Sequence, residues 1–222
     1  MSPLCVTSTA TAAEPCPDIG VAFARGTAEQ PGPGAAGQRF VDSLRAQAFP
    51  RTVGLYGVNY PASSNFAGGP AFTMNIVDGV RDEANHVRGV VSVCPQTQMV
   101  LGGYSQGAAV TALVTSGVVP AGVSPEAVPA PLPPDVADNV VAVVLFGKPA
   151  GPAVPKYGVP ALDVGPAYAS RARELCAPGD TVCSGGLGPG SGAAHGQYAV
   201  NGLADQAAAF AVSRLVALPA PL

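Results

Sequence analysis

Residues 140–146 read VVAVVLF, seven apolar residues in succession. A strand with one face in water alternates apolar and polar side chains, whereas a strand covered on both faces is apolar throughout. Valine is β-branched and favours strands, and the run is short for a buried helix. The segment is therefore predicted to be a central strand, which requires layers of structure on both of its faces.

Shorter apolar runs and helical patterns alternate along the rest of the chain. Further strands are predicted at residues 18–24, 52–60, 97–103 and, with a weaker pattern, 169–176. Apolar residues at helical spacing predict helices at residues 37–48, 71–93, 106–116 and 203–218. Strands that alternate with helices indicate parallel strands joined by right-handed crossovers. The sequence therefore predicts an α/β fold arranged as a three-layer sandwich.

Two predictions concern the surface. In the helix at 71–93 the apolar positions, among them Phe72 and Ile76, define one face, so the charged residues are expected on the other. His86 lies among those charges and is interpreted as a solvated residue. Residues 117–138 are rich in proline and are expected to form a surface excursion.

Composition excludes several classes of protein. The net charge is −3 and 11% of the residues are charged, which argues against the basic surface that nucleic-acid binding needs. An apolar content of 48% argues against disorder. No apolar stretch approaches the roughly 20 residues of a membrane-spanning helix. A length of 222 residues suits one domain with a sizeable core.

The five cysteines and the N-terminal residues indicate the cellular compartment in which the protein works. The sequence alone leaves the pairing of Cys5, Cys16, Cys94, Cys176 and Cys183 open. Cys5 lies in a polar, small-residue stretch whose ATAA run is similar to the end of a secretion signal. Without it, four cysteines remain, which indicates an exported protein in an oxidising setting. The alternative is a cytosolic protein with incidental thiols.

The segment from Gly103 to Gly107, GYSQG, fits the pattern Gly-x-Ser-x-Gly. With 28 glycines in the chain, the pattern alone is weak evidence. Its position adds weight, because it lies where a predicted strand turns directly into a predicted helix, as in the nucleophile elbow of hydrolases. The start of that helix would also direct free N–H groups at a developing oxyanion. Ser105 is therefore the candidate nucleophile.

A serine nucleophile needs a base, and the base needs an orienting acid. His195 is the candidate base because it follows every predicted strand, in the order serine, acid, histidine. The acidic residues between Ser105 and His195 are Glu126, Asp135, Asp138, Asp163, Glu174 and Asp180. Asp180 is preferred because it follows the last strand within CAPGDTVC, where a disulfide between the flanking cysteines would hold its carboxylate.

The segments GGYSQG, CAPGDTVC and AAHGQY together resemble the cutinase family of serine esterases, especially its actinobacterial members. CPDIGVAFARGTAE and LYGVNYPAS are also similar, so the resemblance covers nearly the whole chain from Cys16 onward. It implies an α/β-hydrolase with a central five-stranded parallel sheet. The expected organisation is a signal-peptide remnant or disordered tail at residues 1–14, followed by a single cutinase-like domain at residues 15–222.

The resemblance also implies roles for particular residues. Ser105 matches the nucleophile, Asp180 the acid and His195 the base. Thr27 and the backbone N–H of Gln106 match the oxyanion hole. The implied disulfides are Cys16–Cys94 and Cys176–Cys183.

These residues imply a secreted or cell-wall-associated serine esterase that acts through an acyl-enzyme. The expected partner is an ester or lipid substrate, namely a cutin-like polyester, a short- or medium-chain acyl ester or a lipid. We expect a monomer that uses no metal and no cofactor, binds no nucleic acid and has no transmembrane segment. Loops at residues 61–70 and 185–194, with Phe66 and Leu187, are expected to flank an open cleft.

Other functions remain as alternatives. One is the lipase or phospholipase type of activity of a mycobacterial cutinase-like protein. Another is a non-catalytic cell-wall binding protein on the same scaffold. A dinucleotide-binding oxidoreductase is suggested by GPGAAG at residues 32–37, but an extra stretch separates this motif from the preceding strand. No acidic residue ends the second predicted strand, so this alternative is disfavoured.

Overall fold

The computed structural model describes residues 15–151, 154–155, 161–185 and 191–217. Five parallel strands form one sheet in the order β2-β1-β3-β4-β5. The strands are β1 Ile19–Ala24, β2 Val53–Gly57, β3 Gln98–Tyr104, β4 Val140–Phe146 and β5 Ala172–Leu175. The predicted five-stranded parallel sheet is confirmed. The tail predicted at residues 1–14, with Cys5, lies outside the described residues.

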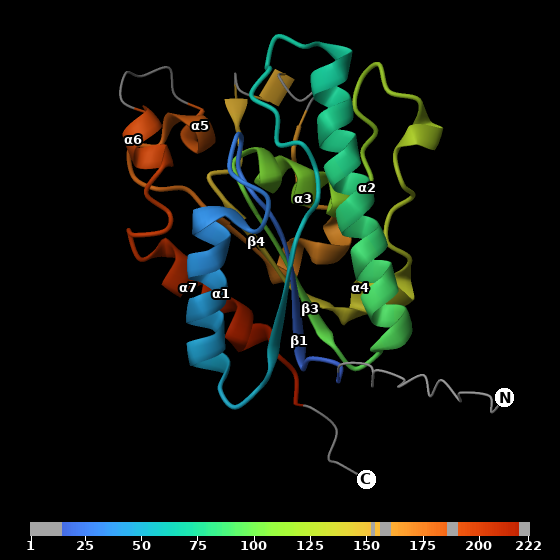
Figure 1. Cartoon of the computed structure of the whole chain (residues 1–222), viewed down its shortest axis with the longest axis vertical. Helices are drawn as coiled ribbons and strands as arrows, with labels where there is room; N and C mark the ends of the chain where they lie inside the picture. The colour runs from blue at the N-terminus through green and yellow to red at the C-terminus, as the bar shows by residue number, and fades with distance from the viewer. Residues whose placement is uncertain (1–14, 152–153, 156–160, 186–190, 218–222) are drawn as a thin grey trace, which may run out of the picture.

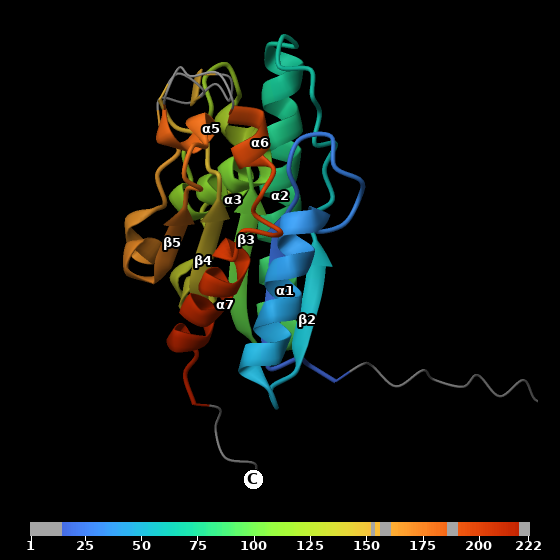
Figure 2. The same ribbon diagram turned by 90° about the vertical axis from the view of Figure 1, so that its left-hand side faces the viewer.

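Helices cover both faces of the sheet, so the predicted three-layer sandwich is confirmed. The longer helices are α1 Gly34–Ala48, α2 Pro70–Val93, α3 Gln106–Ser116 and α7 Leu203–Arg214. Figures 1 and 2 show α1 beside α7 on one face, with α2 and α3 on the other. Shorter helices are α4 Pro134–Asn139, α5 Thr181–Ser184 and α6 Ser191–His195. Among the described residues, no helix is long and apolar enough to cross a membrane.

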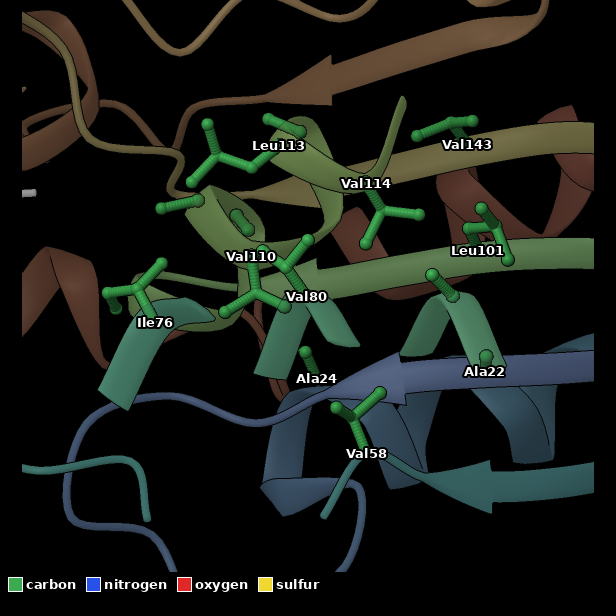
Figure 3. Close-up of a cluster of buried hydrophobic side chains, with 14 of the residues drawn as sticks. Ala22, Ala24, Val58, Ile76, Val80, Leu101, Val110, Leu113, Val114 and Val143 are labelled. Carbon is green, nitrogen blue, oxygen red and sulfur yellow. The ribbon is translucent and has the colours of Figure 1, made fainter. Parts of the chain in front are cut away.

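The side chains of β4 explain why that strand is apolar throughout. Val143 and Leu145 belong to the cluster under α2 and α3, whereas Val144 and Phe146 belong to the cluster under α1 and α7. Successive side chains of a strand point to opposite faces, so both faces of β4 enter a core. Figure 3 shows the α2–α3 cluster, in which Leu101 and Val143 of the sheet lie close to the helices.

The core on the α1–α7 face is built around aromatic rings. The rings of Phe23, Phe40 and Phe146 lie with their centroids 6.0–6.2 Å apart in pairs. A Cβ atom at Gly37 would lie 2.5 Å from the Phe23 ring, and one at Gly102 would lie 2.6 Å from it. Glycine at these two positions therefore leaves the space that Phe23 fills between α1 and the sheet.

The ends of several elements differ from the prediction. Helix α1 begins at Gly34, three residues before the predicted start, and α7 ends at Arg214. The predicted strand at 52–60 is shorter, because β2 ends at Gly57. The first residues of the predicted strand at 169–176 belong to a 3-10 turn, Pro166–Arg171, and β5 follows it. Periodicity locates elements better than their ends, where single hydrogen bonds decide.

The proline-rich segment at 117–138 is not only a surface excursion, so that prediction is wrong in part. Four of its apolar residues are buried in the α2–α3 cluster: Val128, Leu132, Val136 and Ala137. Two arginines of α2 hold its backbone, since Arg81 donates to the Ala127 carbonyl at 2.6 Å and Arg88 to the Ala130 carbonyl at 2.5 Å. Its prolines limit the backbone, but its apolar side chains complete the core.

The prediction that the charges of α2 face away from the core is wrong for Glu83. This residue is 0% exposed, and the Thr111 hydroxyl lies 3.0 and 3.2 Å from its two carboxyl oxygens. The same hydroxyl is 3.0 Å from the Gly102 carbonyl, and its one proton serves one acceptor at a time. Burial raises the pKa of Glu83 well above its ordinary value, which favours the protonated carboxyl, and the protonated form can donate to Thr111.

A disulfide joins Cys16, just before β1, to Cys94, which caps the C-terminus of α2. It is the pairing that the family resemblance implies. The ring spans 78 residues, and the chain-entropy estimate for such a loop is about 4.5 kcal/mol of stability. The start of β1 and the end of α2 are thereby held together.

The free energy of unfolding of the wild type should decrease as the pH rises, because Glu83 ionises. Glu83→Gln should remove this decrease. Folding raises the pKa of this carboxyl, so the folded protein binds the proton more tightly than the unfolded chain does. This stability is fully present below the unfolded value of 4.5 and is lost as the pH rises through the folded pKa. Within that window the wild type should lose up to about 1.4 kcal/mol per pH unit relative to Glu83→Gln.

Urea unfolding of both proteins from about pH 4 to about pH 9 measures this difference. The free energies of unfolding should be similar at the acid end and should diverge in favour of Glu83→Gln as the pH rises. Parallel curves over the whole range would show that Glu83 ionises as readily in the folded protein as in the unfolded chain.

Candidate active site

Ser105 lies on a strained turn between β3 and α3. Its backbone angles are φ 54° and ψ −114°, in the left-handed region that a residue with a side chain rarely adopts. Its N–H donates to the Phe146 carbonyl at 2.9 Å, which continues the pairing of β3 with β4. The turn therefore holds the serine hydroxyl at the carboxyl-terminal edge of the sheet, where α/β proteins bind their ligands.

The two glycines of GYSQG are required by close backbone contacts. A Cβ atom at Gly103 would lie 2.2 Å from the Gly107 carbonyl oxygen, and a Cβ atom at Gly107 would lie 2.0 Å from the Ala24 carbonyl oxygen. Real Cβ contacts are longer than 3.0 Å, and a backbone atom is unable to move aside as a flexible side chain does. The first turn of α3 therefore packs directly on the end of β1.

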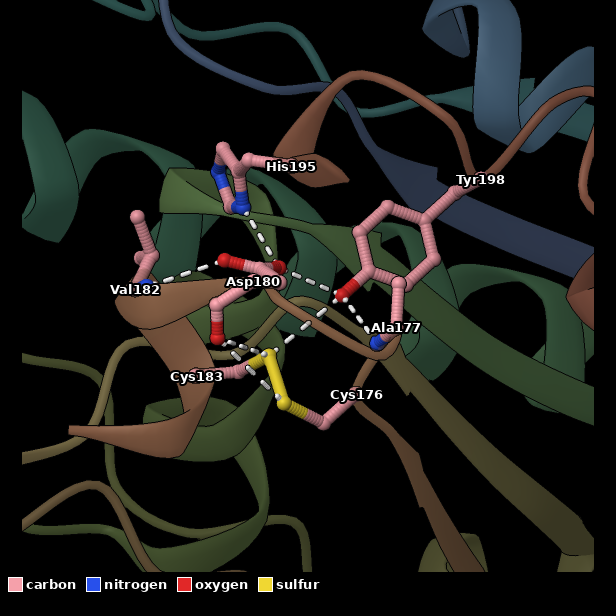
Figure 4. The surroundings of a disulfide bond; sticks show 7 residues. All are labelled: Cys176, Ala177, Asp180, Val182, Cys183, His195 and Tyr198. Atoms are coloured by element: carbon pink, nitrogen blue, oxygen red, sulfur yellow. Dashed lines mark hydrogen bonds and ion pairs between the residues drawn. A yellow bond between two sulfur atoms is a disulfide. The ribbon is translucent and has the colours of Figure 1, made fainter. Parts of the chain in front are cut away.

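Asp180 lies in a short loop that a disulfide closes. Cys176 and Cys183, on either side of it, are joined, which is the second pairing that the resemblance implies (Figure 4). The carboxylate is 0% exposed, and its Oδ1 accepts from the Val182 N–H at 2.9 Å at the start of α5. Burial acts to raise the pKa of Asp180, but hydrogen bonds from Tyr198 and His195 outweigh it and hold that pKa below its ordinary value.

His195, the last residue of α6, connects the serine with the acid. Its Nε2 lies 2.8 Å from Ser105 Oγ, and its Nδ1 lies 2.8 Å from Asp180 Oδ2. The Tyr104 hydroxyl donates to the His195 carbonyl at 2.7 Å, so the residue before the serine also holds the histidine backbone. The structure therefore brings together Ser105, His195 and Asp180, which the sequence proposed as nucleophile, base and acid.

The other histidine and several other acidic residues have different partners. Glu174 forms an ion pair with Lys148 at 2.9 Å, and Glu126 bonds to the Ser124 hydroxyl. His86 stacks on Tyr56 of the edge strand β2, with ring centroids 3.7 Å apart. His86 is half-buried under this contact, and burial lowers its pKa, so its interpretation as a solvated residue is wrong in part.

Gln106 begins α3, and its side chain is completely buried. Its Nε2 donates to the Ser63 carbonyl at 2.9 Å, and its Oε1 accepts from Asn75 Nδ2 at 3.2 Å. Asn75 Oδ1 in turn accepts from the Ser63 N–H at 3.1 Å, which closes a ring of three hydrogen bonds. This ring fixes the first residue of α3, whose backbone N–H has no partner within the helix ladder.

Thr27 is half-buried on the loop that follows β1. The buried Arg25 holds this loop by donating to the carbonyls of Glu29 at 2.9 Å and Tyr60 at 2.5 Å. A Cβ atom at Gly26 would lie 2.6 Å from the Tyr104 ring, so the loop packs on the residue that precedes Ser105. Thr27 thus lies on a tightly held loop that packs against the serine turn.

The glycine-rich segment at 32–37 has a different use from the one its pattern suggests. The Glu29 carboxylate accepts from the N–H of Ala35, in the first turn of α1, at 2.9 Å. The same carboxylate accepts from the Gly26 N–H at 2.6 Å. The start of α1 therefore binds the carboxylate of Glu29 from the Thr27 loop, at the position where a dinucleotide-binding helix would bind a phosphate.

One loop expected at the rim is described in full and the other in part. Phe66 is 42% exposed, and its ring lies 5.2 Å from that of Phe72 on α2. The ring of bonds through Ser63 ties this loop to Gln106. Residues 186–190 of the second loop, with Leu187, lie outside the described residues.

Sequence reasoning missed three residues that hold this site. Asn75 and Ser63 fix Gln106, and the Tyr198 hydroxyl donates to Asp180 Oδ2 at 2.6 Å. Only Tyr198 carried a local signal, because it lies three residues after His195 and a buried tyrosine hydroxyl usually has a partner. Which partner it finds depends on the approach of α6 to the Asp180 loop.

A serine on a strained strand-to-helix turn above a parallel sheet, bonded to a histidine that is itself bonded to an aspartate, defines an α/β-hydrolase. The family model described as Cutinase matches residues 15–215. The chain therefore belongs to the cutinase family.

Three known proteins illustrate the likeness. A Mycobacterium tuberculosis protein described as probable carboxylesterase Culp7 is 49% identical over 170 residues, covering 77% of this chain and 89% of the relative. Another from the same organism, described as phospholipase Culp4, is 42% identical over 200 residues, covering 90% of this chain and 80% of the relative. The structure of Trichoderma reesei cutinase matches with a TM-score of 0.63 and 33% identity, covering 91% of this chain and 78% of that one.

Replacing Gly107 by alanine should destabilise the protein severely. The added methyl group would meet the carbonyls of Ala24 and Arg25, at 2.0 and 2.5 Å, and would force α3 away from β1. We expect a loss of about 3 kcal/mol or more in the free energy of unfolding, or no folded protein. Thermal and urea unfolding measure the effect.

Gly89→Ala is the matched control. Gly89 lies in α2, and no atom within 4 Å would meet its Cβ atom. This change should stabilise the protein by roughly 0.5–1 kcal/mol, because alanine favours helix. A Gly107→Ala protein as stable as the wild type would contradict the contact described between α3 and β1.

Proposed function

We propose that Ser105, His195 and Asp180 form the catalytic triad of a secreted esterase that works through an acyl-enzyme. Membership of the cutinase family and the carboxylesterase relatives make the chain a carboxylic ester hydrolase. The observation that carries the triad is the unbroken chain of hydrogen bonds from Ser105 Oγ through His195 to Asp180, each 2.8 Å long.

The geometry supports the first half of the reaction. A serine hydroxyl is a weak nucleophile until a base removes its proton. His195 Nε2 is within reach of that proton as Ser105 Oγ attacks the ester carbonyl carbon. The buried Asp180 carboxylate accepts from Nδ1, which keeps the lone pair on Nε2 directed at the serine and stabilises the imidazolium that forms.

The tetrahedral intermediate needs donors for its oxyanion. We assign this role to the backbone N–H of Gln106 and to Thr27, which offers an N–H and a hydroxyl. Both lie on backbone that is held firmly, Gln106 by Asn75 and Ser63, and the Thr27 loop by Arg25. Donors fixed before the reaction stabilise the charge without reorganising during it.

The first half ends when His195 gives its proton to the leaving alcohol, and the acyl group stays on Ser105 Oγ. In the second half water attacks the acyl carbonyl carbon while His195 takes a proton from it. His195 then gives this proton to Ser105 Oγ as the bond to the acyl group breaks and the acid leaves. This chemistry uses protein groups only and needs no metal or organic cofactor.

An acyl or lipid ester suits the surroundings of the site better than a sugar ester. Phe66 gives the rim loop an exposed aromatic surface, and the chain contains no tryptophan on which a sugar ring could stack. A phospholipid is the second candidate, because a relative that matches 90% of this chain is described as a phospholipase. The two disulfides are consistent with an extracellular enzyme, and we place its action outside the cytoplasm.

Ser105→Ala and His195→Ala should each lower kcat/KM by about 10³-fold or more while leaving the fold intact. Asp180→Asn should also lower kcat/KM severely, because an amide group would stabilise the wrong tautomer of His195. Hydrolysis of nitrophenyl esters from acetate to palmitate measures the activity and the preferred chain length. Release of fatty acid from phospholipid vesicles separates the phospholipase from the esterase.

Asp163→Asn is the matched control and should keep full activity. Were Asp163→Asn inactive and Asp180→Asn active, the assignment of the acid would be wrong. A folded wild type that hydrolyses no ester and fails to react at Ser105 with a fluorophosphonate would indicate a non-catalytic binding protein.

A further inference from the structure

The Asp180 carboxylate has a second partner besides the histidine (Figure 4). Its Oδ2 accepts from His195 Nδ1 at 2.8 Å and from the Tyr198 hydroxyl at 2.6 Å. Two donors therefore share the oxygen through which the acid acts on the proposed base.

The direction of the tyrosine hydrogen bond follows from the neighbouring groups. The Ala177 N–H lies 3.0 Å from the Tyr198 oxygen and can only donate to it. Cys183 Sγ, 3.4 Å away, is part of a disulfide and has no proton to give. The tyrosine must therefore donate its own proton, and the carboxylate is the stronger and closer acceptor.

Packing holds this hydroxyl in place. Tyr198 is 1% exposed, and its ring meets that of Phe146 edge-on at 6.0 Å and that of Tyr104 at 5.6 Å. The His195 ring lies perpendicular to it, with centroids 6.2 Å apart. The tyrosine is thus fixed by the core on one side and touches the acid on the other.

We propose that Tyr198 is a positioning residue that fixes the Asp180 carboxylate and limits how strongly this carboxylate holds His195. This proposal rests on the catalytic roles assigned above to Asp180 and His195. A hydrogen bond from the tyrosine withdraws negative charge from the shared oxygen, which leaves less for the histidine. The Tyr198 hydroxyl also replaces a hydrogen bond from water that the fully buried carboxylate has lost.

The titratable groups around the carboxylate are few. His195 faces it from α6, Tyr198 from the segment that follows, and Tyr104 from the end of β3, while Cys176 and Cys183 are joined and do not titrate. Burial, Glu29 and Asp180 raise the pKa of Tyr104 to about 12, and burial together with Asp180 raises that of Tyr198. Both tyrosines therefore stay neutral over the working range of an esterase.

The test compares Tyr198→Phe with Tyr168→Phe. Tyr168 is also buried, at 3% exposed, but its hydroxyl has no hydrogen-bond partner among the described residues. On a nitrophenyl ester, Tyr198→Phe should lower kcat about tenfold with little change in KM. The acid limb of its kcat/KM profile should move up by about half a pH unit, because the unshared carboxylate holds the imidazolium more strongly. Tyr168→Phe should leave kcat and the acid limb unchanged.

Introducing Tyr198→Phe into the Asp180→Asn variant tests whether Tyr198 acts through the Asp180 carboxylate. Adding Tyr198→Phe to Asp180→Asn should cost little further activity, since the group that it positions is already gone. Equal losses in the two backgrounds, or an acid limb that does not move in Tyr198→Phe, would overturn the proposal and leave the hydroxyl a structural role. Melting temperatures of all variants detect a loss of folded protein.

The outcome is separable from failure of the proposed function. If Ser105→Ala or Asp180→Asn retained wild-type activity, the triad itself would be wrong. If those variants were inactive and Tyr198→Phe behaved as the wild type, only the role of Tyr198 would be withdrawn.

Discussion

The first turn of α3 packs on the backbone at the end of β1, with Gly107 against the Ala24 carbonyl. Ser105 must then turn sharply between β3 and α3, and its positive φ is a consequence of that approach. The same contact sets the position of the Gln106 N–H and brings the loop with Thr27 beside Tyr104. The proposed nucleophile and both proposed oxyanion donors therefore depend on one contact between a strand and a helix.

Polar groups are buried both in the site and in the α2–α3 core, and the cost of burying each is offset in a different way. Asp180 stays charged because three donors replace its water, namely His195, Tyr198 and the Val182 N–H. Gln106 is neutral and is held in a ring of amide and backbone bonds. Glu83 is completely buried beside the Thr111 hydroxyl, and its raised pKa favours the protonated form, which lowers the cost of burying the carboxyl.

Much of this arrangement was predictable from local patterns. The apolar run at 140–146 and the alternation of strands and helices predicted the layered fold, because a strand buried on two faces has few alternatives. GYSQG, CAPGDTVC and AAHGQY predicted which residues meet, because their order along the chain matches the carboxyl-terminal loops of such a sheet. Residues such as Glu83 and His86 were misjudged, because a helical pattern does not show which neighbouring element covers a charged position.

The amino-acid order was sufficient to predict the five strands, the four longer helices, the three-layer arrangement and the candidate residues Ser105, His195 and Asp180, since strand and helix periods and turn chemistry are local. The short helices α4, α5 and α6 were not predicted. Only tertiary packing determined the contacts that hold the candidate site residues in place, among them those of Asn75 with Gln106 and of Tyr198 with Asp180. These pairs are joined across separate elements by hydrogen bonds a few ångströms long. Whether two such groups meet depends on how α2, α3 and the loops after β5 settle on the sheet, and no spacing within one segment contains that information.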